Sequence, residues 1–340
     1  MAGWRLSVLL PAVLAAAAHG FHVAPTLHGK SLRLRSPVKM AVVDEAFEKA
    51  DTVILERALR VTNHAAALTS LAYFGLVSST MQLPNTQMPM ATLASVITRN
   101  LGPTTNAAFS AQFSTLVTPA AYVFLIWPFI AATQIITLAV SILRPALDTP
   151  PGNSLAALNS IGKGEPLSQR ELAALTLANA AATAWLFVSS NSLPGALPLA
   201  SALVLPLVPL FAAYPLRNWP APPALYRPVF QIFSSFTTIA SCLALAVELQ
   251  HGGRLAFFLG KAELCACVFL ALVARLVSLP QRSLARRAVQ ALALSGVVAR
   301  RLASGAGVAA LLRSPSFVGA VALLGWSVKK LVAPEVSSTD

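Results

Sequence analysis

The chain has 340 residues, of which 56% are hydrophobic and only 11% are charged, and its formal net charge is +13. A soluble globular domain carries about 25% charged residues, so this composition excludes an ordinary water-soluble protein and indicates that lipid surrounds most of the chain. Five of the basic residues precede Asp44, the first acidic residue. The remaining ones lie mainly at the ends of apolar runs and are not interleaved with aromatic residues, so the charge does not indicate a nucleic-acid partner.

Two targeting segments are predicted at the start of the chain. Residues 1–20 have an early arginine, an apolar stretch and small residues, which is typical of a signal peptide. Residues 21–40 are basic, hydroxylated and free of acidic residues, which is typical of an organellar transit peptide. This series, with Phe21 after the expected cleavage site, resembles the bipartite plastid presequence of algae with secondary plastids and implies a plastid membrane. The alternative is a plain secretory signal followed by a basic linker, which leads to an endomembrane or the plasma membrane.

Apolar runs of transmembrane length recur through the rest of the chain, because about 20 apolar residues in a helix cross the ~30 Å hydrocarbon core. We predict an all-α, polytopic transmembrane helix bundle of about seven spans. The predicted spans are 65–81, 119–143, 171–190, 196–214, 228–247, 257–279 and one or both of 284–301 and 315–328. The predicted organisation is a signal peptide (1–20), a transit-peptide-like segment (21–40), an amphipathic segment (41–64), a transmembrane domain (65–330) and a polar tail (331–340).

The distribution of basic residues predicts the orientation of the bundle. Most of them lie before the first span, in loops 144–170 and 215–227, and in the 280s. The positive-inside rule assigns these segments to the side equivalent to the cytoplasm. Within the span 196–214, Pro206 and Pro209 predict either a structural kink or a broken helix of the kind that carriers use.

The most distinctive stretch of the sequence is TPAAYVFLIW at residues 118–127. It resembles the translocator-protein family, and in particular its extended members, the tryptophan-rich sensory proteins, whose second span opens with T-P-A-G-Y-x-F-x-I-W. Two further segments resemble that family in the same order. They are 177–187, which contains Leu177-Ala-Asn179 and Trp185-Leu-Phe187, and 230–240.

The resemblance implies a five-helix core around an aromatic pocket that binds tetrapyrroles, sterols or other flat hydrophobic molecules. The ligand-binding residues that it implies are Tyr122, Phe124, Trp127, Asn179, Trp185, Phe233 and Phe236. The chain departs from the family where a Trp-His pair is expected, at Ser189-Ser190, and where a Tyr and a Trp are expected, at Phe233 and Phe236. These departures argue against porphyrin-specific contacts but keep the stacking surface. An interfacial aromatic belt would also explain Trp127 and Tyr122, and helix packing would also explain Asn179.

The sequence contains no recognisable catalytic motif and no His or Cys pattern with metal-ligand spacing, so we predict neither an enzyme nor a metal site. We expect a membrane protein that binds or helps to move a hydrophobic small molecule, with no cofactor unless a tetrapyrrole is that ligand. The expected partners are membrane lipids, the ligand, and a homo-oligomer or larger membrane complex. The alternatives are a structural or assembly subunit of a membrane complex and, less favoured, an ion-coupled carrier.

Overall fold

Every element that the computed structural model describes is a helix. The described residues are 58–59, 61–72, 74–75, 112–147, 167–190, 197–218, 226–252, 258, 261–278 and 283–332. Both predicted targeting segments, most of the predicted amphipathic segment and most of the polar tail lie outside these residues. The prediction of an all-α membrane bundle is confirmed by the described helices and their apolar character.

The described helices follow the predicted spans closely in position and order. Residues 61–72 are helical and belong to the first predicted span. The remaining elements are η1 (Ala121–Leu125), α5 (Ile126–Leu147), α7 (Gln169–Ser190), α8 (Leu197–Val204), α9 (Leu207–Asn218), α10 (Arg227–His251), α11 (Ala262–Ser278), α12 (Leu284–Leu302), α13 (Val308–Arg313) and α14 (Pro315–Val332). Four helical stretches are long and apolar enough to cross a membrane, namely Ala121–Leu143, Pro198–Leu216, Arg227–His251 and Pro315–Val332.

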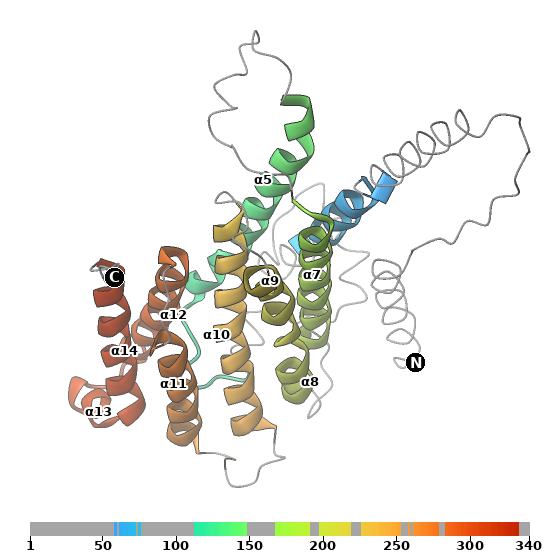
Figure 1. Ribbon diagram of the computed structural model, residues 1–340. Helices are drawn as coiled ribbons and strands as arrows, with labels where there is room; N and C mark the ends of the chain where they lie inside the picture. Colours follow the sequence, from blue (N-terminus) through green and yellow to red (C-terminus); the bar gives the residue numbers. More distant parts are fainter. Residues whose placement is uncertain are drawn as a thin grey trace, which may run out of the picture.

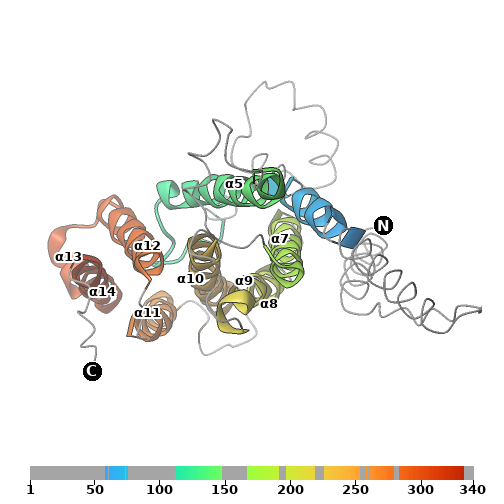
Figure 2. The same cartoon turned by 45° about the horizontal axis from the view of Figure 1, so that its top comes forward.

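Helix α10 is the centre of the bundle. It lies between α5, α7, α8 and α9 on one side and α11, α12 and α14 on the other (Figure 2). Among the four candidate spans α10 is the most buried and α14 the least. The small and hydroxylated residues of α10 allow this close packing, because helices in lipid associate through tight van der Waals contact and not through expulsion of water.

The C-terminal segment, whose topology the sequence leaves open, forms two antiparallel helices. Arg287, in the first turn of α12, donates from Nη1 to the carbonyl of Lys330 in the last turn of α14, 2.5 Å away. At the other end Arg301 Nη2 donates to Ser314 Oγ, 2.7 Å away, just before α14 begins. The two helices therefore run beside each other along their whole length. Only α14 has the length and apolarity of a span, because α12 carries paired arginines at both ends.

The predicted fourth span is interrupted, as its prolines suggest. Helix α8 ends at Val204 and α9 begins at Leu207, with a turn at Leu205 and Pro206 between them. Proline has no backbone N–H, so Pro206 cannot complete the hydrogen-bond ladder and the helix axis changes there. The break lies one turn beyond Ser201, which contacts the site described below.

Charged side chains divide unequally between the two ends of the bundle. Helices α7, α10 and α12 begin at the end where α5, α9, α11 and α14 finish, in the upper part of Figure 1. Among the described side chains this end has seven basic residues and one carboxylate, whereas the opposite end has four basic residues and two carboxylates. The richer end is the one that the positive-inside rule assigns to the cytoplasm-equivalent side.

The start of the second span is held against α12. The backbone N–H of Ala120 donates to the carbonyl of Gly296, 2.9 Å away, and Tyr122 Oη lies 2.9 Å from Ser295 Oγ. Between these contacts the chain forms the short 3₁₀ helix η1, which continues directly into α5. Helix α12 therefore fixes the entry of the helix that carries Trp127.

Candidate ligand-binding site

Five aromatic side chains from four helical segments meet in the core of the bundle. This aromatic cluster consists of Phe74 from the first helical segment, Trp127 from α5, Trp185 from α7, and Phe233 and Phe236 from α10. Phe233 and Phe236 are three residues apart and so lie on one face of α10. Four of these five residues are among those that the family resemblance implies for the ligand site.

Trp127 is the hub of the aromatic cluster. Its ring stacks on that of Trp185, with centroids 5.8 Å apart and an interplanar angle of 23°. It makes edge-to-face contacts with Phe236 at 5.0 Å and with Phe74 at 5.5 Å. Phe74 extends the cluster to Phe233, 6.4 Å away. Offset stacking and edge-to-face arrangements of this kind each contribute about 0.5–1.5 kcal/mol beyond the area they bury.

All five rings are buried, from 0% exposure for Phe74 and Phe233 to 8% for Trp185. Most of their surface is therefore in contact with protein. A ligand can enter only if some of these rings change rotamer or if the surrounding helices separate.

Three buried polar atoms on α5 and α7, the two helices whose tryptophans stack on each other, have no hydrogen-bond partner. They are the indole Nε1 of Trp127, the amide Nε2 of Gln134 and the amide Oδ1 of Asn179. Trp127 and Asn179 are buried to 1% and 0% exposure. Because a buried polar group without a partner costs about 1–3 kcal/mol, such atoms are uncommon in the core of a folded protein. A bound molecule or an ordered water would remove this cost.

Gln134 and Asn179 form a side-chain pair between α5 and α7. Asn179 Nδ2 donates to Gln134 Oε1, 2.8 Å away, and both side chains are 0% exposed. Gln134 follows Trp127 by seven residues, so the two lie on the same face of α5 about two turns apart. The amide pair keeps one donor and one acceptor unused and could bind a neutral hydroxyl, carbonyl or amide group.

Trp185 connects the aromatic cluster to the broken helix. Its indole Nε1 donates to Ser201 Oγ on α8, 2.7 Å away. Ser201 is 2% exposed and precedes the turn at Leu205 and Pro206 by about one helical turn. A change in the angle between α8 and α9 would therefore act directly on the position of the Trp185 ring.

One of the predicted residues, Tyr122, lies away from the aromatic cluster. Tyr122 is 42% exposed and contacts Ser295 of α12, on a different face of the second span from Trp127. Phe124 is partly buried and packs against the hydrophobic core. The structure thus brings together Trp127, Trp185, Phe233 and Phe236, places Asn179 on the helix that carries Trp185, and leaves Tyr122 outside.

Three residues near the site were not singled out from the sequence. Gln134 could have been found from its heptad spacing to Trp127, which puts a polar side chain on the same buried face. Phe74 and Ser201 lie in ordinary apolar segments, and no local signal marks them. Gln231, a polar residue at the start of α10, accepts a 2.5 Å hydrogen bond from Ser283 and serves to join α10 to α12.

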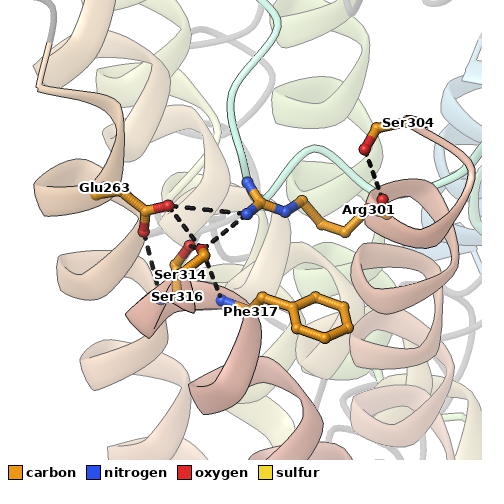
Figure 3. Close-up of polar contacts among 6 residues, drawn as sticks. All are labelled: Glu263, Arg301, Ser304, Ser314, Ser316 and Phe317. Carbon is orange, nitrogen blue, oxygen red and sulfur yellow. Dashed lines mark hydrogen bonds and ion pairs between the residues drawn. The ribbon is translucent and has the colours of Figure 1, made fainter. Parts of the chain in front are cut away.

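A group of polar side chains around Glu263, at the end of the bundle that has fewer basic residues, has a structural role. Glu263 at the start of α11 accepts hydrogen bonds from Ser314 Oγ at 2.6 Å and from the backbone N–H of Ser316 at 3.3 Å, and lies 3.7 Å from Arg301 Nη2 (Figure 3). These contacts cap the N-terminus of α14, where unpaired N–H groups favour a carboxylate. They join the ends of α11, α12 and α14.

The helices and their apolar surfaces define an integral membrane protein whose bundle has an aromatic interior. Comparison with known families agrees with this class, because the model of the TSPO-like protein family matches residues 82–328. This is well over half of the chain, and the chain belongs to that family. No curated protein and no solved structure matches the chain.

Proposed function

We propose that this member of the TSPO-like family binds, or helps to move, a flat hydrophobic molecule at the aromatic cluster, without catalysing a reaction. The observation that carries the proposal is the meeting of five aromatic rings in the core, with the unpartnered indole N–H of Trp127 among them and the unpartnered amide atoms of Gln134 and Asn179 on the same two helices as the stacked tryptophans. The rings supply stacking surface on which a planar ligand replaces contacts that the rings now make with one another.

The chemistry of the site favours a neutral ligand. The five rings and the two amides of Gln134 and Asn179 carry no charge, so a ligand carboxylate would be buried beside them without a counter-ion. Burying an unpaired charge costs far more than burying a hydrogen-bonded neutral group. A sterol-like or other lipid-like molecule with one hydroxyl or carbonyl fits this set of atoms better than a tetrapyrrole, whose carboxylates need cations.

A structural or assembly role in a membrane complex is the second candidate. It is favoured by the contact between the rings themselves, since packed aromatic and small residues also serve to hold helices together in lipid. In the first candidate the rings of the aromatic cluster rearrange to admit a ligand, and in the second they do not. A ligand-binding titration can therefore distinguish the two.

The first experiment is a tryptophan-fluorescence titration of the purified protein with a sterol and with protoporphyrin. We expect saturable quenching by the neutral ligand, and weaker apparent affinity in the Trp127→Phe and Asn179→Leu variants. Trp127→Phe keeps a ring in the aromatic cluster but removes the unpartnered indole N–H, and Asn179→Leu removes the amide acceptor. Both lose atoms that the ligand is proposed to use.

Two substitutions serve as matched controls for this titration. Trp326→Phe removes a tryptophan on α14 outside the aromatic cluster, and Tyr122→Phe removes a hydroxyl that contacts α12. Neither should change the apparent affinity. Quenching that does not saturate, or that falls equally in all four variants, would reject the ligand site and favour the structural role, which in turn predicts co-purification with a large complex in mild detergent.

We further propose a plastid membrane as the location, on the basis of the signal-like and transit-like segments in series. A fluorescent protein fused behind residues 1–40 should enter the plastid of an alga with a secondary plastid. A fluorescent protein fused behind residues 1–20 alone should remain in the secretory pathway, because only the signal peptide is then present. Secretion of both fusions would contradict the plastid location.

A further inference from the structure

Three helix ends meet at the basic end of the bundle, where α11 finishes, α12 begins and α14 finishes. Arg287 Nη1 donates to the Lys330 carbonyl at 2.5 Å, and Lys330 Nζ donates to the Val277 carbonyl at 3.3 Å. These bonds satisfy carbonyl groups that a helix C-terminus leaves unpaired. They also bring the ends of α11, α12 and α14 into direct contact.

Five basic side chains surround this junction, and we call them the basic seam. They are Arg275, Arg286, Arg287, Lys329 and Lys330. Arg275 and Lys329 are exposed, whereas Arg287 is 9% exposed. The bonds to helix carbonyls account for the positions of Arg287 and Lys330, but not for the two exposed cations.

The basic seam has a large excess of positive charge. The only carboxylate within α11, α12 and α14 is Glu263, which lies at the opposite end of α11 in its first turn. The tail beyond α14 contains Glu335 and Asp340, and the residues between α11 and α12 add Arg282. Among the side chains that the structure describes on these three helices, no carboxylate lies at this end to offset the five cations of the basic seam.

The position of Trp326 places the basic seam at the level of lipid headgroups. Trp326 is 39% exposed on α14, and Lys330 Nζ lies 4.9 Å from the centre of its ring. Tryptophan and lysine occupy the headgroup region at the ends of membrane helices. Toward the middle of α14 the side chains of Val318 and Val321 are exposed and offer an apolar surface for acyl chains.

We propose that the basic seam binds an anionic phospholipid, with the lipid phosphate at the ends of α11, α12 and α14 and the acyl chains along the outer surface of α14. The charge of the basic seam is complementary to a phosphate, and the arginines offer paired donors to its oxygens. The headgroup would join three helix ends that each carry a basic residue in their terminal turns. A zwitterionic lipid has no net charge, so the basic seam should attract it less strongly than an anionic lipid.

Lipid selectivity can be measured on the full-length protein through Trp326. The protein is reconstituted in phosphatidylcholine vesicles that contain a fixed fraction of either brominated phosphatidylglycerol or brominated phosphatidylcholine. The difference in quenching between the protein and its Trp326→Phe variant gives the contribution of Trp326. Since one basic residue near an anionic surface changes affinity about fivefold, we expect at least a roughly fivefold preference for phosphatidylglycerol.

Matched charge substitutions identify the surface that is responsible. Arg275→Gln with Lys329→Gln should bring the preference close to one, because both exposed cations of the basic seam are lost. Arg300→Gln with Arg313→Gln removes the same charge from the opposite end of the bundle and should leave the preference unchanged. Equal quenching by the two lipids, or an equal loss in both double variants, would overturn the proposal.

A final arm separates a lipid phosphate from a free one. Added inorganic phosphate at the ionic strength of a chloride control should not release the brominated phosphatidylglycerol, because the acyl chains hold the lipid on α14. Release by phosphate but not by chloride would show a site for soluble anions and would overturn the lipid proposal. None of these results depends on the aromatic cluster, so the ligand proposal stands or fails separately.

Discussion

Replacement of Trp127 by alanine should destabilise the folded protein by about 3–5 kcal/mol, the range found when large buried aromatic residues are truncated. Trp127 is 1% exposed and its ring contacts Phe74, Trp185 and Phe236. Alanine leaves a cavity at the meeting point of α5, α7 and α10. In a bilayer the loss comes from these van der Waals contacts, since helix association in lipid does not depend on the expulsion of water.

Thermal unfolding in detergent, followed by circular dichroism, measures this loss. Trp326→Ala is the matched control, because Trp326 is 39% exposed and its ring contacts the ammonium of Lys330. That substitution should cost only about 0.5–1 kcal/mol, the value of an exposed cation–π contact. If both variants unfold at the same temperature, the aromatic cluster is not a centre of the fold.

Much of the aromatic cluster could be predicted from the sequence, because its members occur in segments with family-like spacing. Trp127, Trp185, Phe233 and Phe236 were all expected at one site and do lie together. Phe74 could not be found in this way, since its segment has no distinctive motif and its role depends on contacts across the bundle. The pairing of Gln134 with Asn179 likewise depends on how α5 and α7 are rotated about their axes.

Tyr122 shows where local reasoning fails. Its motif places it close to Trp127 along the chain, but the 3₁₀ turn η1 and the contact with Ser295 direct it toward α12. The role of α12 was also undecided from the sequence. Hydropathy averages over the whole helix, whereas α12 buries one largely apolar face, together with Arg287 and Gln290, against its neighbours. A helix of low hydropathy can therefore still be part of a membrane bundle.

Helix α12 also approaches the start of the second span closely at Gly296. A methyl group added there would overlap Val123 Cγ2 and lie 3.2 Å from Pro119 Cβ and 3.4 Å from the Ala120 nitrogen. Gly296→Ala must therefore move η1 away from α12 and strain the Ala120 N–H bond to the Gly296 carbonyl. Overpacking of this kind costs about 1–3 kcal/mol, which exceeds the gain of about 0.5–1 kcal/mol that alanine brings to a helix.

A glycine-to-alanine substitution in α14 is the control that shows whether the steric clash at Gly296 causes the loss of stability. Gly325 has no atom within 4 Å of an added methyl group, so Gly325→Ala should raise the unfolding temperature slightly while Gly296→Ala lowers it. Val123→Ala removes the side chain that the new methyl group meets. Combined with Gly296→Ala it should lose less stability than the two single changes predict together, because neighbouring substitutions that relieve one clash are not additive. Strict additivity would mean that α12 does not hold η1 in place, and that the entry of α5 is fixed elsewhere.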